Sequence, residues 1–142
     1  MELRVKQVRE VPGPLLDAFG LLMPQLSPQL AAPSSERLQA IVESPSAALF
    51  AAEAEGCIRG LLTLVWYDVP SGGKAWIEDV VVDAEARGTG AGRALVAAAL
   101  EHAAVIGAGK GLLTSNPARE AARALYRKMG FEEAATTVFA IK

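Results

Sequence analysis

The amino-acid sequence predicts an α/β fold in which a mixed sheet carries helices on both faces. Three apolar runs follow one another within residues 47–82, separated only by short turns. Apolar residues at helical spacing occur on both sides of this stretch, and the predicted order is strand, two helices, three strands, helix, strand, helix, strand. A plain doubly wound fold would alternate more regularly, so we expect the mixed arrangement.

The first third of the chain predicts one strand and two helices. Apolar and charged residues alternate over residues 3–9, which indicates an opening strand that the Pro-Gly-Pro sequence at 12–14 ends. Residues 15–22 are predicted to form a helix. Three prolines within residues 24–33 predict a loop that is not regular helix throughout. A second helix is expected to begin at residues 34–36, Ser-Ser-Glu.

The centre of the chain predicts three strands in succession. Residues 47–53 and 57–67 are apolar runs joined by Glu55-Gly56, which is typical of a hairpin turn. A second turn is expected over residues 68–73, and a third strand over residues 75–82.

After the third strand, apolar residues recur at helical spacing over residues 95–106, and glycines at 107 and 109 predict the end of that helix. A short strand is expected over residues 111–115. Pro117 suits the first turn of a last helix, with Ser115 or Asn116 as its cap and Gly130 as its stop. Residues 136–141 are predicted to complete the sheet as a final strand.

The bulk composition narrows the class of protein. With 142 residues, of which 51% are hydrophobic, a single domain spanning residues 1–142 is expected. The net charge of −2 gives no support for a nucleic-acid partner. One cysteine rules out an internal disulfide, the N-terminus is unlike a signal peptide, and no run of about 18 apolar residues would span a bilayer. We therefore expect a cytoplasmic protein with no membrane association.

A glycine-rich turn is the most informative feature of the sequence. The β-branched run Val80-Val81-Val82 enters the turn at residues 87–93, which leads directly into an apolar helix. Backbone N–H groups and the helix dipole make such a turn a phosphate site. Glycines at 88, 90 and 92 do not fit the G-x-G-x-x-G dinucleotide fingerprint, and the Gly-Lys-Ser/Thr ending of a P-loop is missing. A tight turn without a ligand is the alternative.

Two motifs resemble those of the GNAT superfamily of N-acetyltransferases. Arg87-Gly88-Thr89-Gly90-Ala91-Gly92 resembles the family's Arg/Gln-x-x-Gly-x-Gly/Ala motif. The segment at residues 122–131, Ala-Arg-Ala-Leu-Tyr-Arg-Lys-Met-Gly-Phe, resembles its closing Ala-x-x-Leu-Tyr-x-x-x-Gly-Phe pattern at the expected separation. The resemblance implies a GNAT-like fold whose central, mostly antiparallel, twisted sheet is flanked by about four helices.

The resemblance also implies acetyl-CoA as co-substrate, with no metal. The turn would cradle its pyrophosphate, and the preceding strand would pair with the pantetheine amides and polarise the thioester carbonyl. Many family members carry an asparagine seven residues before the tyrosine of the closing motif, where this chain has Arg119, which we expect to contact CoA or an acidic substrate group. The implied CoA-binding residues are Val80, Val81, Val82, Arg87, Gly88, Thr89, Gly90, Ala91, Gly92, Arg93 and Arg119.

Two residues are expected to carry the chemistry. By the resemblance, Tyr126 protonates the departing thiolate, and a helical wheel places it on the shoulder of a buried face; a core-edge tyrosine without a catalytic role is the alternative. Glu78 is predicted to take the proton of the amine. On a regular strand it shares a face with Trp76, Val80 and Val82, but a bulge would change this parity and leave Asp79 as a rival. An ordinary polar strand position is the alternative for both carboxylates.

The predicted function is transfer of acetyl from acetyl-CoA to a primary amine of a small molecule or peptide, by direct attack in a ternary complex. A non-catalytic acyl-CoA-binding module is the first alternative, and another nucleotide-dependent enzyme is the second. Cys57 is expected to be a buried thiol, and His102 to have a surface or helix-packing role. The final strand at 136–141 would either complete its own sheet or pair with a second subunit in a homodimer.

Overall fold

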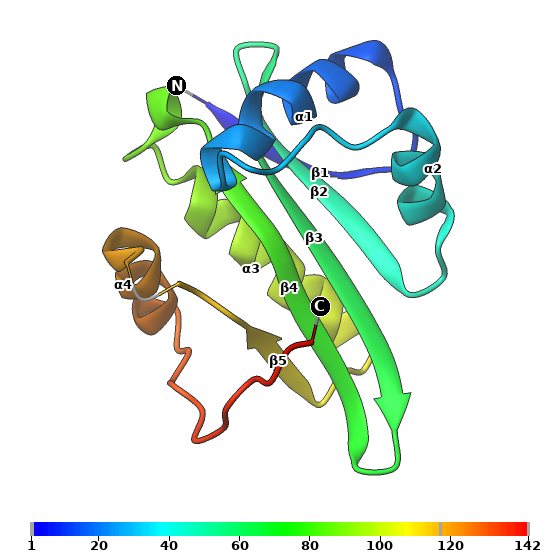
Figure 1. The fold of residues 1–142 in the computed structure, drawn as a ribbon, viewed down its shortest axis with the longest axis vertical. Helices are drawn as coiled ribbons and strands as arrows, with labels where there is room; N and C mark the ends of the chain where they lie inside the picture. Colours follow the sequence, from blue (N-terminus) through cyan, green and yellow to red (C-terminus); the bar gives the residue numbers. More distant parts are fainter. Residues whose placement is uncertain (1, 117, 142) are drawn as a thin grey trace.

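The computed structural model describes residues 2–116 and 118–141, and it contains one five-stranded sheet with helices on both faces (Figure 1). The strands are arranged in the order β1-β2-β3-β4-β5, antiparallel from β1 to β4 and parallel between β4 and β5. The mixed sheet expected from the sequence is therefore confirmed. The elements in chain order are β1 Leu3–Val8, α1 Gly13–Leu26, α2 Ser35–Glu43, β2 Ala47–Ala54, β3 Cys57–Val69, β4 Gly72–Val82, the 3-10 helix η1 Ala84–Ala86, α3 Ala91–Val105, β5 Lys110–Leu113 and α4 Glu120–Lys128.

Two apolar layers cover the two faces of the sheet. On one face α3 packs through Leu95, Val96 and Ala99 against the sheet, and α4 adds Tyr126 to the same layer. On the other face α1 and α2 pack against the sheet, with Leu22 and Leu38 almost wholly buried. Figure 1 shows α3 behind the strands and α1 with α2 in front of them. The sheet is thus sandwiched as the sequence predicts.

A bulge in β4 changes which side chains share a face. Leu61 of β3 lies opposite Val81, but Thr63 lies opposite Glu78, so β4 contains one extra residue between these pairs. Asp79 takes up the irregularity with a φ of 49°. The prediction that Glu78 shares a face with Val80 and Val82 is therefore wrong.

The two sides of the bulge belong to different layers of the molecule. Val80 and Val82 pack with the layer on the α3 face, whereas Val81 packs with the layer on the α1 face. Before the bulge, Ile77 belongs to the α3 layer, and its neighbours Trp76 and Glu78 therefore point to the opposite face. The structure thus contains the bulge that the sequence analysis gave as an alternative to a regular strand. Asp79 therefore stays a second candidate for the carboxylate base.

The strands β4 and β5 pair over only part of their length. The last paired residues are Ile77 and Leu113, so the described chain beyond this point has no ladder between β4 and the segment after β5. The two strands consequently part at Glu78 and the bulge. The backbone of β4 beyond Ile77 is therefore not paired with β5, and such an edge can pair with an extended ligand.

Helix α1 continues past the position where the sequence predicts a loop. It runs through Pro24 to Leu26, and the Ser27 N–H donates to the Met23 carbonyl at its end. Proline removes one helical hydrogen bond, which costs stability but does not end a helix whose last turns are held by packing. Leu22 and Met23 supply that packing, with exposed fractions of 0% and 9%.

The last helix and the last strand also differ from the prediction. Helix α4 begins at Glu120 with Arg119 at its N-cap, while Asn116 instead accepts the Ala118 N–H at 2.9 Å in a preceding turn; Pro117 lies outside the described residues. Residues 131–141 form no strand. Because residues 132–141 are all exposed, no burial offsets the entropy that ordering a strand would cost.

Three further side chains can be compared with expectation. Cys57 is exposed rather than buried, because it is the first residue of β3, directly after the hairpin turn. The His102 ring lies against Phe50 and Trp66, with centroid distances of 5.6 and 5.4 Å, which is a helix-packing role. No helix within the described ranges has the length and apolar character that crossing a membrane requires.

Candidate active site

The glycine turn lies between the end of β4 and the first turn of α3. Gly88 and Gly90 have φ angles of 79° and 90°, a left-handed conformation that side chains other than glycine adopt at a cost. Gly90 is the N-cap of α3, so the N–H groups of the first helical turn, from Ala91 onward, face the turn without acceptors in their own helix. This is the arrangement that binds phosphate groups.

Glycine is required at the three positions of the motif for two different reasons. A Cβ on Gly88 or Gly90 would meet nothing within 4 Å, so backbone conformation alone requires glycine there. A Cβ on Gly92 would lie 3.3 Å from Leu125 Cδ2 and 3.6 Å from Val82 Cγ2. Gly92 therefore allows α4 and β4 to approach the start of α3 closely. The sequence motif does not reveal that Gly88 and Gly90 are required by backbone conformation and Gly92 by packing.

A cavity of about 680 Å³, the turn cavity, opens beside this turn between β4 and α4. Three arginines and one glutamate line it, so its charge favours an anionic ligand. Of the predicted CoA-binding residues, Val81 and Thr89 do not line it: the Val81 side chain packs on the opposite face, and the Thr89 hydroxyl donates to the Ala86 carbonyl. The predicted residues that line the turn cavity are Val80, Val82, Arg87, Gly88, Gly90, Ala91, Gly92, Arg93 and Arg119.

A second, smaller cavity of about 250 Å³, the carboxylate cavity, lies where β4 and β5 part. Glu78 and Asp79 line it from the bulge, and Leu26 lines it from the end of α1. Partial burial, and to a lesser extent the neighbouring charge of Asp79, raise the pKa of Glu78 above the 4.5 of a free glutamate. A carboxylate with a raised pKa is a better proton acceptor near neutral pH.

The turn cavity and the carboxylate cavity meet at the same residues. Val80, Arg119 and Tyr126 line both of them. Tyr126 is 7% exposed, the most buried residue of α4, rather than on the shoulder of its apolar face as the helical wheel predicts. Its ring packs within the apolar layer on the α3 face and lies 6.1 Å from the Phe131 ring, which accounts for its burial.

The environment of Tyr126 keeps its hydroxyl protonated. Burial raises its pKa above 10.0, and the positive charge of Arg119 partly opposes this effect. A neutral phenol between an anion-binding cavity and a carboxylate pair is suited to donate a proton to a leaving group. The two catalytic candidates from the sequence, Glu78 and Tyr126, thus line one cavity, although they come from β4 and α4.

Two residues of this site are missed by the sequence reasoning. Ser115 lines the carboxylate cavity together with Glu78 and Tyr126, and its Oγ is buried without a hydrogen-bond partner in the described structure. Leu26 reaches the same cavity because α1 continues past its proline. The unpartnered hydroxyl is a signal that only coordinates reveal, since serine is common in loops.

A third cavity of about 360 Å³, the tail cavity, continues from Tyr126 and Ser115 toward residues 132–138. Trp76 lines it from β4, and the Trp76 indole N–H donates to the Tyr67 hydroxyl at 2.8 Å. Arg123 and Glu133 form an ion pair of 3.0 Å beside it. Trp66, in contrast, packs on the α3 face and does not border these cavities. No cluster of His, Cys, Asp or Glu side chains fit to hold a metal occurs among the described residues.

Comparisons with known proteins identify the family and the fold of this chain. The sequence matches the model of the acetyltransferase (GNAT) family over residues 15–131, whereas no curated protein matches it. The structure resembles a transcriptional regulator from Bacillus halodurans C-125, with a TM-score of 0.87, 22% identity and 99% of both chains covered.

Two aminoglycoside acetyltransferases are also similar in structure. One, from an uncultured soil metagenomic sample in complex with trehalose, has a TM-score of 0.81 and 21% identity over 99% of this chain and 97% of that one. The other, AAC(6')-Iy, was solved with the bisubstrate analogue CoA-S-monomethyl-acetylneamine, and it has a TM-score of 0.81 and 21% identity over 100% and 99% of the chains. At this identity the likeness concerns the fold.

Proposed function

Because this chain belongs to the acetyltransferase (GNAT) family, we propose that it moves the acetyl group of acetyl-CoA to a primary amine of a small molecule or peptide. The observation that carries the proposal is the meeting of the turn cavity and the carboxylate cavity at Tyr126 and Arg119. One cavity has the charge and backbone geometry for a phosphorylated donor, and the other has a carboxylate suited to an amine. Both substrates would then be bound at once, in a ternary complex.

The donor would occupy the turn cavity. Its pyrophosphate would lie at the first turn of α3, within reach of Arg87 and Arg93, where backbone N–H groups and the helix dipole favour negative charge. The pantetheine arm would extend along Val80 and Val82, whose strand has no β5 partner at this height. Strand-like pairing with the amides of the arm is the recognition that such an edge offers.

The acceptor would approach from the carboxylate cavity. An alkylamine is protonated at neutral pH, and the negative charges of Glu78 and Asp79 favour its entry. Glu78, with its raised pKa, would take one proton from the ammonium group, directly or through water. The aminoglycoside substrates implied by the names of two structural neighbours are amines of this cationic kind, which supports the class without naming the compound.

The transfer then follows from the positions of the two groups. The neutral amine attacks the thioester carbonyl, whose oxygen a backbone N–H of β4 would stabilise as negative charge develops. The nitrogen–carbon bond forms and the carbon–sulfur bond breaks, while the Tyr126 hydroxyl protonates the departing sulfur. The remaining surplus proton on the nitrogen passes through solvent to the tyrosinate. Much of the rate would come from positioning both substrates.

A thiol-release assay with acetyl-CoA and a panel of primary amines tests the proposal. The panel should contain aminoglycosides, polyamines and peptides. Tertiary amines are the control, because their nitrogen has no proton to release once it is bonded to the acetyl carbon, so no stable amide forms. We expect thiol release with at least one primary amine and none with its tertiary counterpart. The absence of CoA binding by calorimetry would overturn the proposal.

Nothing in the comparisons supports the alternative of a CoA-binding module without activity. The variant Tyr126→Phe separates the two functions, because it removes the proton donor and keeps the ring that packs against Phe131. An acetyltransferase should lose turnover and keep CoA affinity. If wild type binds CoA and no amine in the panel yields turnover, the binding module becomes the better description.

A further inference from the structure

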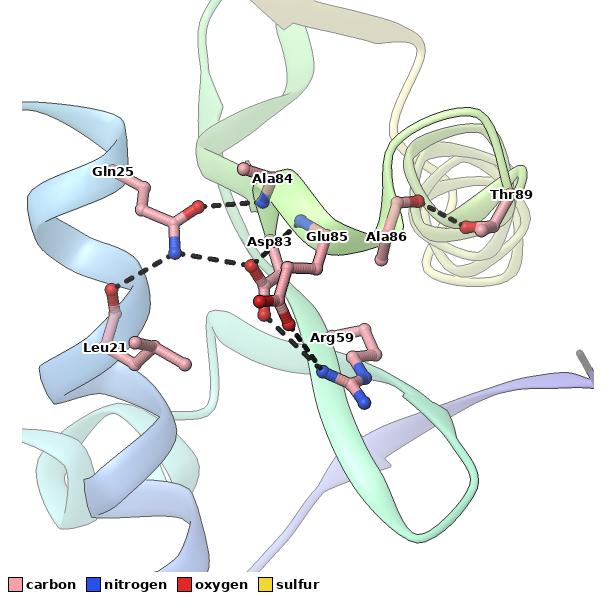
Figure 2. A network of polar contacts seen from close by, with 8 residues as sticks. All are labelled: Leu21, Gln25, Arg59, Asp83, Ala84, Glu85, Ala86 and Thr89. Atoms are coloured by element: carbon pink, nitrogen blue, oxygen red, sulfur yellow. Dashed lines mark hydrogen bonds and ion pairs between the residues drawn. The ribbon is translucent and has the colours of Figure 1, made fainter.

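A buried carboxylate joins three elements directly before the glycine turn. Asp83 is 4% exposed and lies between β4 and η1. Its Oδ1 accepts the Glu85 N–H at 3.2 Å, and its Oδ2 lies 3.6 Å from Arg59 Nη1 of β3. Its own N–H donates to the Arg59 carbonyl at 2.8 Å. Figure 2 shows these groups together with Gln25 of α1, which approaches from the opposite side.

The Gln25 carboxamide holds the same junction through both of its ends. Its Oε1 accepts the Ala84 N–H at 2.9 Å, and its Nε2 lies 3.4 Å from Asp83 Oδ1 and 3.5 Å from the Leu21 carbonyl of its own helix. Figure 2 shows this side chain reaching from α1 to the start of η1. Among the described residues, the contacts of Gln25 with Asp83 and Ala84 are the polar contacts between α1 and the segment that leads into the turn.

The buried carboxylate depends on the glutamine because its ion pair is long. A buried charge is tolerated only when hydrogen bonds and opposite charges satisfy it. Arg59 contributes from 3.6 Å and also reaches Glu85 at 3.9 Å, and its buried Nε has no partner in the described structure. The carboxylate oxygens of Asp83 therefore also depend on the Glu85 N–H at 3.2 Å and on Gln25 Nε2 at 3.4 Å.

The segments that Gln25 connects, the end of α1 and η1, each lie next to one of the two cavities. Leu26, the neighbour of Gln25, lines the carboxylate cavity, and the loop to α2 follows it. On the other side η1 leads into the turn: the Ala86 carbonyl accepts the Thr89 N–H, and Ala86 and Arg87 line the turn cavity. A shift of η1 on ligand binding would therefore be passed to the end of α1 through Gln25, in addition to the apolar packing of α1 on the sheet.

We propose that Gln25 is a positioning residue that couples the two cavities: CoA bound at the glycine turn fixes η1, and Gln25 thereby fixes the end of α1 that borders the acceptor. This inference rests on the proposed function, because it takes the turn as the site of CoA. Gln25 touches neither substrate in this scheme. Its effect is to make the rigidity of the end of α1 depend on CoA binding at the glycine turn.

Hydrogen–deuterium exchange of the full chain, with and without CoA, tests the coupling. In wild type we expect CoA to slow exchange both in the turn and in residues 21–27. In Gln25→Ala the slowing should persist in the turn and disappear in residues 21–27, and CoA should bind about 3- to 10-fold more weakly, as expected for lost hydrogen bonds. Gln39→Ala, which removes an exposed carboxamide that only contacts Glu43 of its own helix, is the matched control.

The variant Gln25→Glu provides a rescue by protonation. An ionised glutamate would stand beside Asp83 and Glu85, with Arg59 as the nearby cation, and would repel the buried carboxylate. Its protonated form has one donor and one acceptor, as the carboxamide does. The ratio of CoA dissociation constants, variant to wild type, should therefore fall toward one as the pH decreases from 8 to 5.

The outcomes distinguish this inference from the proposed function. If wild type does not bind CoA, the proposed function fails and the coupling fails with it. If CoA binds and slows exchange in the turn alone, or if Gln25→Ala keeps the slowing in residues 21–27, the coupling is wrong and the proposed function stands. A Gln25→Glu ratio that does not change with pH would also contradict the role given to the carboxamide.

Discussion

Because the glycines of the turn are required for different reasons, the effect of Gly90→Ala can be predicted. At a φ of 90° the added Cβ strains the backbone, which costs on the order of 1–2 kcal/mol for a left-handed residue. The Cβ has no protein atom within 4 Å, so the methyl group stands in the space beside the turn cavity. There it would keep a phosphate from the N–H groups of α3. Since a hydrogen bond to a charged group contributes roughly 1.5–3 kcal/mol, the loss of one predicts at least tenfold weaker CoA binding.

Gly92→Ala is the matched comparison, because it adds the same methyl group two residues away. Its Cβ would meet Leu125 and Val82 rather than open space, and Leu125 must move by a few tenths of an ångström. The better helix propensity of alanine, up to about 1 kcal/mol, offsets this strain. Urea unfolding should therefore show Gly90→Ala as the less stable variant, and calorimetry should show CoA affinity falling mainly in Gly90→Ala. Equal loss of affinity in both variants would refute the assignment of Gly90 to the phosphate site.

Three further predictions concern the chemistry of the site. Because burial and Asp79 raise the pKa of Glu78, the rate should increase with pH through a midpoint above the ordinary 4.5. Glu78→Gln should abolish this increase and lower kcat by about 10²–10⁴. Asp79→Asn should move the midpoint to lower pH. A pH–rate profile that Glu78→Gln leaves intact would exclude this base. Tyr126→Phe should lower kcat by a similar factor and leave the CoA dissociation constant within about twofold, measured by steady-state kinetics and calorimetry; an unchanged kcat would remove the tyrosine from the mechanism. Ser115→Ala should leave the free energy of unfolding unchanged or raise it by about 1 kcal/mol, since it deletes a buried hydroxyl without a partner, and denaturant titration would expose the error if stability fell by that amount.

The raised pKa of Glu78 also has a consequence for stability. A carboxyl group whose pKa is higher in the folded state than in the unfolded chain favours folding at low pH, and this contribution is lost as the pH rises through the folded-state value. The wild-type protein therefore carries a small destabilisation from this carboxylate at neutral pH, as is common where catalysis needs a perturbed group. The same burial that costs stability makes the group a proton acceptor.

Local patterns predicted the parts of the fold that depend on local physics. The turn at 87–93 was predictable because left-handed glycines and the helix that follows leave a direct trace in the sequence. The hairpin at Glu55-Gly56 was predictable for the same reason, and both of its residues have positive φ. Helix α1 through Pro24 was not, because burial of Leu22 and Met23 overrides the proline, and burial is set by the tertiary fold.

The predictions that the structure contradicts concern features that depend on how distant segments of the chain pair or pack. The bulge at Asp79 is defined only by its register against β3, so alternation along β4 wrongly placed Glu78 on the same face as Val80 and Val82. Residues 136–141 have strand composition, but a strand also needs a partner edge and a surface to cover, and these residues remain exposed. The helical wheel placed Tyr126 on the shoulder of the apolar face of α4, whereas it is the buried residue of that helix, because burial is set by the layer that the helix joins.

Arg119 shows how the site differs from the family pattern without losing its logic. The asparagine that many family members carry at this position is neutral, whereas this chain places a cation where both cavities meet. Burial raises the pKa of the Tyr126 phenol and so weakens it as an acid, and the Arg119 charge opposes this effect in part. The same charge would stabilise a thiolate as the carbon–sulfur bond breaks. In the proposed reaction the arginine therefore assists both partners of one proton transfer, so that Arg119→Asn should lower kcat more than it raises the KM for acetyl-CoA.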